Sequence, residues 1–294
     1  MNYRIVHVTR YEYHEWINLC HHEARLAPRN NARQTCLLSQ IAVDPPPEAY
    51  REREDFFGNR VAYFAVQQPH TRMTVTATSE VRREVAVNQI DLFGGIAWEA
   101  AREALSGPSK NFDWLYARQF ALESPLVGYA NEAEQYAQVS FTPHRPLLEA
   151  THDLMRRIHE DFAFVPGFTN VSTPLSEVIE QRKGVCQDFA HFSLACLRSL
   201  GLAARYVSGY FETLPPPGSE RLTGVDASHA WFSVFVPGSG WVDFDPTNNL
   251  MPGNKHITLA WGRDYLDVSP LKGVVFSAGK HDLHVSVDVI RTGG

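Results

Sequence analysis

The sequence contains few cysteines and no strong charge bias. Four cysteines among 294 residues, with no Cys-x-x-Cys pair, exclude a disulfide framework and argue against a zinc ribbon or thioredoxin-type site. The formal net charge is only −6, and neither sign is gathered into a tail. This balance gives no electrostatic footprint for nucleic acid or for an anionic membrane surface, so neither is expected as a partner.

Long hydrophobic runs are also missing. No apolar stretch is long enough to cross a bilayer, and the N-terminus alternates like a strand instead of carrying the apolar run of a signal peptide. We therefore expect a cytoplasmic protein. With 294 residues, 44% of them hydrophobic, the chain has enough material for one large domain or two ordinary ones.

The first part of the chain is typical of an all-β domain. Alternating or β-branched segments at 3–13, 60–66 and 73–83 are separated by turn residues at 44–47 and 57–59. Several short strands with turn signals predict a small β-sandwich over residues 1–90. Residues 91–145 are expected to form a linker region with short helices, one of them near 98–105.

The second part mixes helices and strands. Helical spacing of apolar residues predicts helices at 147–162, 172–182 and 186–200. Strands are predicted at 205–211, 230–236 and 241–245, and the alternating tail at 282–289 is expected to close the same sheet. The fold class is thus α+β: an N-terminal sandwich followed, over 146–294, by helices packed on an antiparallel sheet.

Cys186 stands where a nucleophile is favoured. It follows Gly184 by two residues and opens a predicted helix. The first turn of a helix has unpaired N–H groups and the positive end of the helix dipole, and both favour a thiolate, which is the nucleophilic form. The same N–H groups could receive an oxyanion after attack on a carbonyl.

His229 and Asp245 complete a possible triad. His229 begins one predicted strand, and Asp245 ends the next, which is reached through a tight turn at 237–240. Antiparallel pairing would place these two strand ends side by side. Cys186 would then be the nucleophile, His229 the base and Asp245 the acid that orients the base, as in a Cys-His-Asp triad.

Each of these residues also has a structural interpretation. A single cysteine is often only a buried apolar residue, and Cys186 with His191 and His229 could instead hold zinc, although such sites want further ligands. Asp188 and His191 could satisfy each other or support the site. Trp231 and Trp241 are expected in the core or in a pocket wall, and the remaining cysteines (Cys20, Cys36 and Cys196) are expected to be structural.

Four sequence blocks resemble the bacterial transglutaminase-like superfamily of cysteine proteases. They are Gly184-Val-Cys-Gln-Asp-Phe-Ala-His191, Ala204-Arg-Tyr-Val-Ser-Gly-Tyr210, Ser228-His-Ala-Trp231 and Gly240-Trp-Val-Asp-Phe-Asp-Pro-Thr-Asn248. The N-terminal region resembles the domain that precedes this core in the bacterial proteins. The resemblance implies a papain-like core with Cys186, His229 and Asp245 as catalytic residues. Gln187 and Tyr206, within the blocks, are expected to support the site or line its pocket.

The expected function is cysteine-dependent acyl transfer, most simply hydrolysis of a peptide, isopeptide or other amide bond in a peptide or protein substrate. The family implied by the resemblance includes protein cross-linkers, peptidases and amidases, so a transglutaminase that uses an amine acceptor stays open. A non-catalytic binding module is the third alternative. No metal or organic cofactor is expected, and the sequence does not reveal the oligomeric state.

Overall fold

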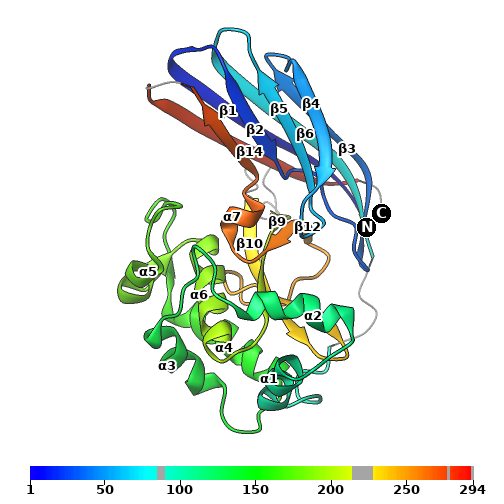
Figure 1. Ribbon diagram of the computed structural model, residues 1–294, viewed down its shortest axis with the longest axis vertical. Coiled ribbons are helices and arrows are strands. Elements are labelled where there is room, and N and C mark those ends of the chain that lie inside the picture. Colours follow the sequence, from blue (N-terminus) through cyan, green and yellow to red (C-terminus); the bar gives the residue numbers. More distant parts are fainter. Residues whose placement is uncertain (85–89, 214–227, 277–278, 293–294) are drawn as a thin grey trace, which may run out of the picture.

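The computed structural model describes residues 1–84, 90–213, 228–276 and 279–292. In Figure 1 the strand-rich N-terminal domain lies at one end of the molecule and most of the helices lie at the other. The antiparallel sheet of the second domain lies between them. This sheet positions the candidate site, because the N-terminal domain contacts one of its edges and the helices pack on one of its faces.

The N-terminal domain is built from two four-stranded antiparallel sheets. The strands of the first sheet, in spatial order, are β14 (His281–Thr292), β1 (Asn2–Ile17), β6 (His70–Arg83) and β3 (Gln34–Asp44). Those of the second are β13 (Leu271–Val275), β2 (Cys20–Ala24), β5 (Arg60–Val66) and β4 (Ala49–Glu54). Met73 and Val75 of the first sheet share a core with Phe64 and Val66 of the second, as the predicted sandwich requires.

The C-terminal strands belong to this N-terminal domain. β14 pairs with β1 in the register Ile5↔Val289, and β13 pairs with β2. The expectation that the tail closes the sheet of the second domain is therefore wrong. Alternation along 282–289 correctly predicts a strand, but it does not identify the partner strand. The exact domain boundaries stay a prediction.

The central sheet has the order β11-β10-β9-β12. Its strands are β9 (Ala204–Phe211), β10 (Ser228–Val236), β11 (Gly240–Phe244) and β12 (His256–Gly262). The first three confirm the predicted strands. The predicted hairpin joins β10 and β11, and its glycines Gly238 and Gly240 adopt φ of 85° and 88°, which favours glycine.

The N-terminal domain packs against the outer edge of β12, which is an edge strand of the central sheet. An edge strand has unpaired backbone groups that must find partners when they are buried. The buried Gln34 side chain accepts from the Thr258 N–H at 2.9 Å and donates to the Thr258 carbonyl at 2.7 Å. The buried Asn59 amide does the same for Trp261, at 3.0 and 2.9 Å. Two amide side chains thus join the domains.

The helices confirm the predicted ones and add others. Their bounds are α1 (Trp98–Ser106), α2 (Phe112–Arg118), η1 (Gln119–Ala121), α3 (Asn131–Ser140), α4 (Leu147–Asp161), α5 (Leu175–Gln181), α6 (Cys186–Ser199) and α7 (Tyr265–Val268). Two short strands, β7 (Ala163–Phe164) and β8 (Lys183–Gly184), pair beside α5. The sequence did not predict α2 or α3, yet Ala133 and Ala137 of α3 are fully buried in the main core.

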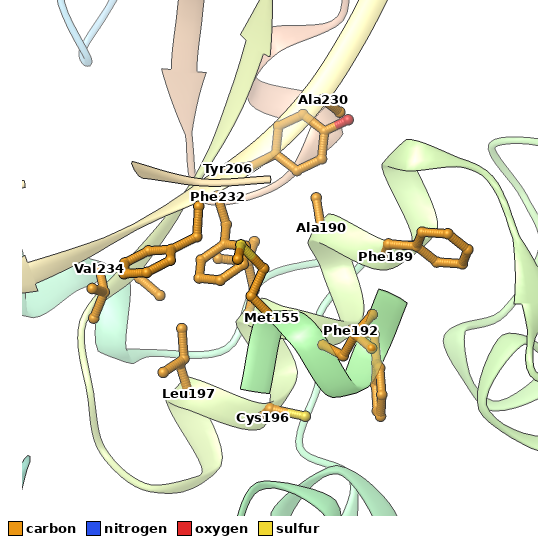
Figure 2. Close-up of a cluster of buried hydrophobic side chains, with 14 of the residues drawn as sticks. Met155, Phe189, Ala190, Phe192, Cys196, Leu197, Tyr206, Ala230, Phe232 and Val234 are labelled. Carbon is orange, nitrogen blue, oxygen red and sulfur yellow. The ribbon is translucent and has the colours of Figure 1, made fainter. Parts of the chain in front are cut away.

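α6 is the central helix, and every residue from Asp188 to Arg198 is buried, including the polar Asp188, His191, Ser193 and Arg198. Figure 2 shows its residues Ala190 and Leu197 near side chains of the sheet and of α4. Tyr206, Phe232 and Val234 belong to the same buried cluster. This packing fixes the position of the first turn of α6. Within the described residues, no helix combines the length and apolarity needed to span a membrane.

Candidate active site

Cys186 is the first residue of α6, and a buried carboxylate fixes the turn that presents it. The Asp188 carboxylate accepts a hydrogen bond from the Val185 N–H at 2.7 Å and another from the Thr169 hydroxyl at 2.5 Å. A Cβ on Gly184 would lie 2.8 Å from the Asp188 Cβ, so this approach requires glycine. Asp188 therefore caps the helix and supports the half-buried Cys186 from behind.

His229 lies at the start of β10 and binds the acid that was predicted for it. Its Nε2 is 2.7 Å from Asp245 Oδ2. Burial lowers the pKa of His229, but hydrogen bonds and charge interactions with Asp245 and Cys186 outweigh this effect and raise the pKa from 6.5 to about 10. Because Nε2 is held by Asp245, Nδ1 is the ring nitrogen left for the Cys186 sulfur.

Asp245 is fully buried and accepts five hydrogen bonds. Its Oδ1 receives the backbone N–H groups of Thr247 and Asn248 at 3.0 and 3.2 Å. Its Oδ2 receives the Asn248 amide at 2.8 Å and the two imidazoles of His229 and His256 at 2.7 and 2.9 Å. Burial raises the pKa of Asp245, but the histidine contacts lower it well below its usual range. The carboxylate is therefore ionised and fixed in orientation.

His256 is a second histidine on the same carboxylate, and the sequence did not predict it. It lies on β12, is 1% exposed, and its ring packs against Phe211 and Trp231 with centroids 4.8 and 5.1 Å apart. Burial outweighs the effect of Asp245 and lowers the pKa of His256, which favours a neutral imidazole that donates from Nε2. No motif surrounds His256, so only the pairing of β12 with β9 could have revealed it.

A further histidine secures the loop after Asp245. His159 Nδ1, on α4, donates to the backbone carbonyls of Pro246 and Thr247, at 3.2 and 3.0 Å. The sequence predicts only that this residue lies in the helix at 147–162. The contact joins α4 to the turn that sets the direction of the Asp245 side chain.

His191 of α6 and Tyr206 of β9 are buried neighbours of each other. His191 is buried, and its Nε2 accepts a hydrogen bond from the Tyr265 N–H at 3.2 Å. Burial lowers the pKa of His191 to about 4, so the ring is neutral. It packs against Tyr206, with ring centroids 5.0 Å apart. Burial also raises the pKa of Tyr206 well above 10, and the Cys186 charge contributes to this rise.

Three further residues were predicted to support the site or line its pocket: Trp231, Gln187 and Trp241. Trp231 is fully buried, with its ring centroid 6.0 Å from that of His229. Gln187 is half-buried beside Cys186. Trp241 does not lie beside the triad, because four residues of extended chain, roughly 13 Å, separate it from Asp245. It packs against Phe120 and Phe235, as its core interpretation predicts.

His229, Asp245 and His256 have the composition of a metal site but the spacing of a hydrogen-bonded cluster. Their ligand atoms lie within 4.8 Å of one another. Around a tetrahedral zinc ion, however, neighbouring nitrogen and oxygen ligands lie about 3.3 Å apart. Here each histidine approaches the carboxylate oxygen to 2.7 or 2.9 Å. Shared protons account for these contacts.

Comparisons with known proteins identify the family of both domains. Residues 3–82 match the bacterial transglutaminase-like N-terminal region, and residues 134–246 match the transglutaminase-like superfamily. The second match spans Cys186, His229 and Asp245. A protein of Mycobacterium tuberculosis that is described as uncharacterized is 40% identical over 298 residues, covering 98% of this chain and 92% of the relative.

Two further matches show which parts of the chain are shared more widely. A protein-glutamine gamma-glutamyltransferase of Pseudomonas aeruginosa is 32% identical over 125 residues, which cover 40% of this chain and 19% of that protein. A solved structure from Cytophaga hutchinsonii, described as a "putative cysteine protease", has a TM-score of 0.75 at 22% identity. That match covers 100% of this chain and 92% of the other, and it shows the shared fold.

Proposed function

This chain belongs to the transglutaminase-like superfamily, and we propose that it is a cysteine-dependent acyl-transfer enzyme that hydrolyses an amide bond through Cys186, His229 and Asp245. The observation that carries the proposal is the pairing of His229 with a buried, ionised Asp245 at 2.7 Å, beside a cysteine that opens a buried helix. The raised pKa of His229, about 10, supports an imidazolium next to sulfur at neutral pH.

In the first half of the reaction, the Cys186 thiolate attacks the carbonyl carbon of the scissile amide and a carbon–sulfur bond forms. The developing oxyanion is received by backbone N–H groups at the start of α6, including that of Cys186. His229 gives its Nδ1 proton to the leaving nitrogen as the carbon–nitrogen bond breaks. The products of this step are a free amine and a thioester on Cys186.

In the second half, a water molecule attacks the thioester. His229, now neutral at Nδ1, takes a proton from that water, and the carbon–sulfur bond breaks to release a carboxylic acid and the thiolate. Asp245 stays ionised throughout and stabilises the imidazolium through Nε2. Its five donors supply a rigid support, so the ring needs little reorganisation between the two steps.

Transamidation is the second candidate. In this reaction an amine, instead of water, attacks the same thioester and a new amide forms. The similarity of 125 residues to a protein-glutamine gamma-glutamyltransferase favours it. The two candidates share every step up to the thioester, and they differ only in the acceptor that reaches it.

One experiment separates the candidates. A glutamine-containing peptide and a panel of peptide and isopeptide amides are incubated with the protein, with and without a primary amine. Free acid or cleaved peptide in both conditions indicates a hydrolase, whereas an amine-linked product indicates a transferase. Cys186→Ala abolishes either product, while Cys36→Ala, which removes a partly buried thiol of the N-terminal domain, retains it. Equal turnover by wild type and Cys186→Ala would overturn both candidates.

A further inference from the structure

A cavity lies on the face of the central sheet opposite to α6. Tyr206 and Phe232 belong to the buried cluster that packs with α6, so their strand neighbours Arg205 and Ser233 point to the opposite face. There a cavity of about 700 Å³ is bounded by the sheet, the start of α4 and residues of the N-terminal domain. This volume is within the usual range for small-molecule sites, and no triad residue lines it.

Arg205 forms the floor of this cavity between two tryptophan rings. Its guanidinium carbon lies 3.8 Å from the Trp261 ring centroid and 4.3 Å from that of Trp241. The residue is 7% exposed, and its Nε donates a long hydrogen bond of 3.4 Å to Ser233 Oγ. Among the described residues, no carboxylate forms an ion pair with Arg205. The nearby carboxylate is Asp243, which accepts a hydrogen bond from Ser233 Oγ and raises the pKa of Arg205 only through space, against a larger lowering by burial. A buried cation that lacks a direct carboxylate contact is stabilised further when an anion binds to it.

A second buried arginine lines the same cavity. Arg83, at the end of β6, is 6% exposed and donates from Nη2 to the Gly253 carbonyl at 2.8 Å. Its Nε is buried and has no hydrogen-bond partner among the described residues. A third arginine, Arg33, lies exposed at the rim, and the lining carboxylates are Asp91 and Asp243. The lining therefore carries one positive charge in excess.

Apolar residues also line the cavity. Ile96, Leu148 and Met251 are among them, and each is only partly buried. Partly exposed apolar side chains beside buried guanidinium groups are complementary to a molecule that has an apolar body and one anionic end. A single excess positive charge matches a monoanion better than a dianion.

We propose that this cavity binds a small organic monocarboxylate, with the carboxylate on Arg83 and Arg205 and the apolar body against Leu148 and Met251. The site lies outside the catalytic triad and goes beyond the proposed acyl-transfer function. A carboxylate can accept paired hydrogen bonds from guanidinium groups, which is the geometry that arginine recognises best.

The test uses octanoate and benzoate as probes, with octanamide and benzamide as neutral controls of the same shapes. Calorimetric titration of the full chain measures affinity, and the fluorescence of Trp241 and Trp261 reports binding at the cavity. We expect at least one carboxylate to bind with a dissociation constant below about 1 mM. Its amide should bind on the order of tenfold more weakly.

Three variants assign the binding to the cavity. Arg83→Gln and Arg205→Gln should weaken carboxylate binding on the order of tenfold, whereas Asp243→Asn should tighten it several-fold because it removes a repelling charge. Asp243 is only partly buried, and asparagine keeps an oxygen that can accept from Ser233 Oγ, so this variant decides the matter even if the arginine variants fail to fold. Equal affinity for carboxylate and amide, no measurable binding of either carboxylate, or an unchanged affinity in Asp243→Asn would overturn the proposal.

Discussion

The charge of Asp245 should control the ionisation of its neighbours, and Asp245→Asn tests this directly. Asparagine keeps the shape and one acceptor oxygen but removes the negative charge. In the wild type, burial lowers the pKa of His229, and Asp245 and Cys186 together raise it from 6.5 to about 10. Without the carboxylate charge, burial should lower the pKa of His229 well below 6.5, as it lowers the pKa values of the buried His7 and His191 to about 4.

The size of the effect follows from these values. A rise in pKa from 6.5 to about 10 corresponds to roughly 5 kcal/mol of preference for the imidazolium, shared between Asp245 and Cys186. An ordinary thiol with a pKa of about 8.5 is only about 0.3% thiolate at pH 6. If the variant loses the imidazolium of His229, Cys186 should behave as such an ordinary thiol. Its reaction with iodoacetamide at pH 6 should then slow on the order of ten- to a hundredfold, because the smaller thiolate fraction is partly offset by the higher nucleophilicity of a more basic thiolate.

The assay measures alkylation of each cysteine by peptide mass spectrometry between about pH 5 and pH 10. Cys36 provides an internal reference within the same molecule. The matched control is Asp282→Asn, because Asp282 also contacts a histidine, His14 at 2.9 Å, but on the exposed surface of the N-terminal domain. The wild type and the control should react alike, and the Asp245→Asn profile should approach theirs only at alkaline pH. Identical rates for Asp245→Asn and wild type at pH 6 would refute the reasoning.

Further predictions concern the support of the site. His256→Phe removes one donor from the buried carboxylate and should cost about 2 kcal/mol in the free energy of unfolding, measured by urea titration, while His256→Gln should recover part of the loss. Gly184→Ala drives a Cβ to within 2.8 Å of the Asp188 side chain and should cost about 1–3 kcal/mol and slow alkylation of Cys186; Gly253→Ala, which meets no atom within 4 Å, should do neither. Because the pKa of Asp245 is lowered in the folded protein, ionised Asp245 stabilises the fold above about pH 3.8, and this contribution is lost as the pH falls further. Because the pKa of the adjoining His229 is raised to about 10, protonated His229 stabilises the fold below 6.5, and this contribution is lost as the pH rises toward 10. The difference in thermal unfolding temperature between Asp245→Asn and wild type should therefore be largest between about pH 3.8 and pH 6.5, where both contributions are present. A difference that stays constant across pH would contradict this linkage. Prolonged EDTA treatment should leave activity unchanged, because protons account for the short contacts to Asp245; loss of activity that zinc restores would count against this.

Local patterns predicted the elements that carry the candidate triad. The helix after Gly184, the strand after Ser228 and the tight turn at 237–240 are each encoded within a few residues, so Cys186, His229 and Asp245 could be placed from sequence. The contact between His229 and Asp245 is confirmed at 2.7 Å. Their catalytic roles stay a prediction.

Long-range pairing could not be predicted in the same way. His256 reaches Asp245 only because β12 pairs with β9, and His159 reaches the following loop only because α4 packs beside it. Similarly, the alternation at 282–289 predicted a strand but not its pairing with β1. Such contacts depend on tertiary packing between segments far apart in the chain, which periodicity in one segment does not encode.

The central claim is that the Cys186 sulfur becomes acylated with the help of His229. Mixing the protein with p-nitrophenyl acetate and measuring the intact and peptide masses tests it most directly. The account predicts a single acetyl group on Cys186 in the wild type, formed in a burst, and far slower acetylation in His229→Ala. An acetyl group that forms equally fast in the variant, or that resides on a residue other than Cys186, would contradict it.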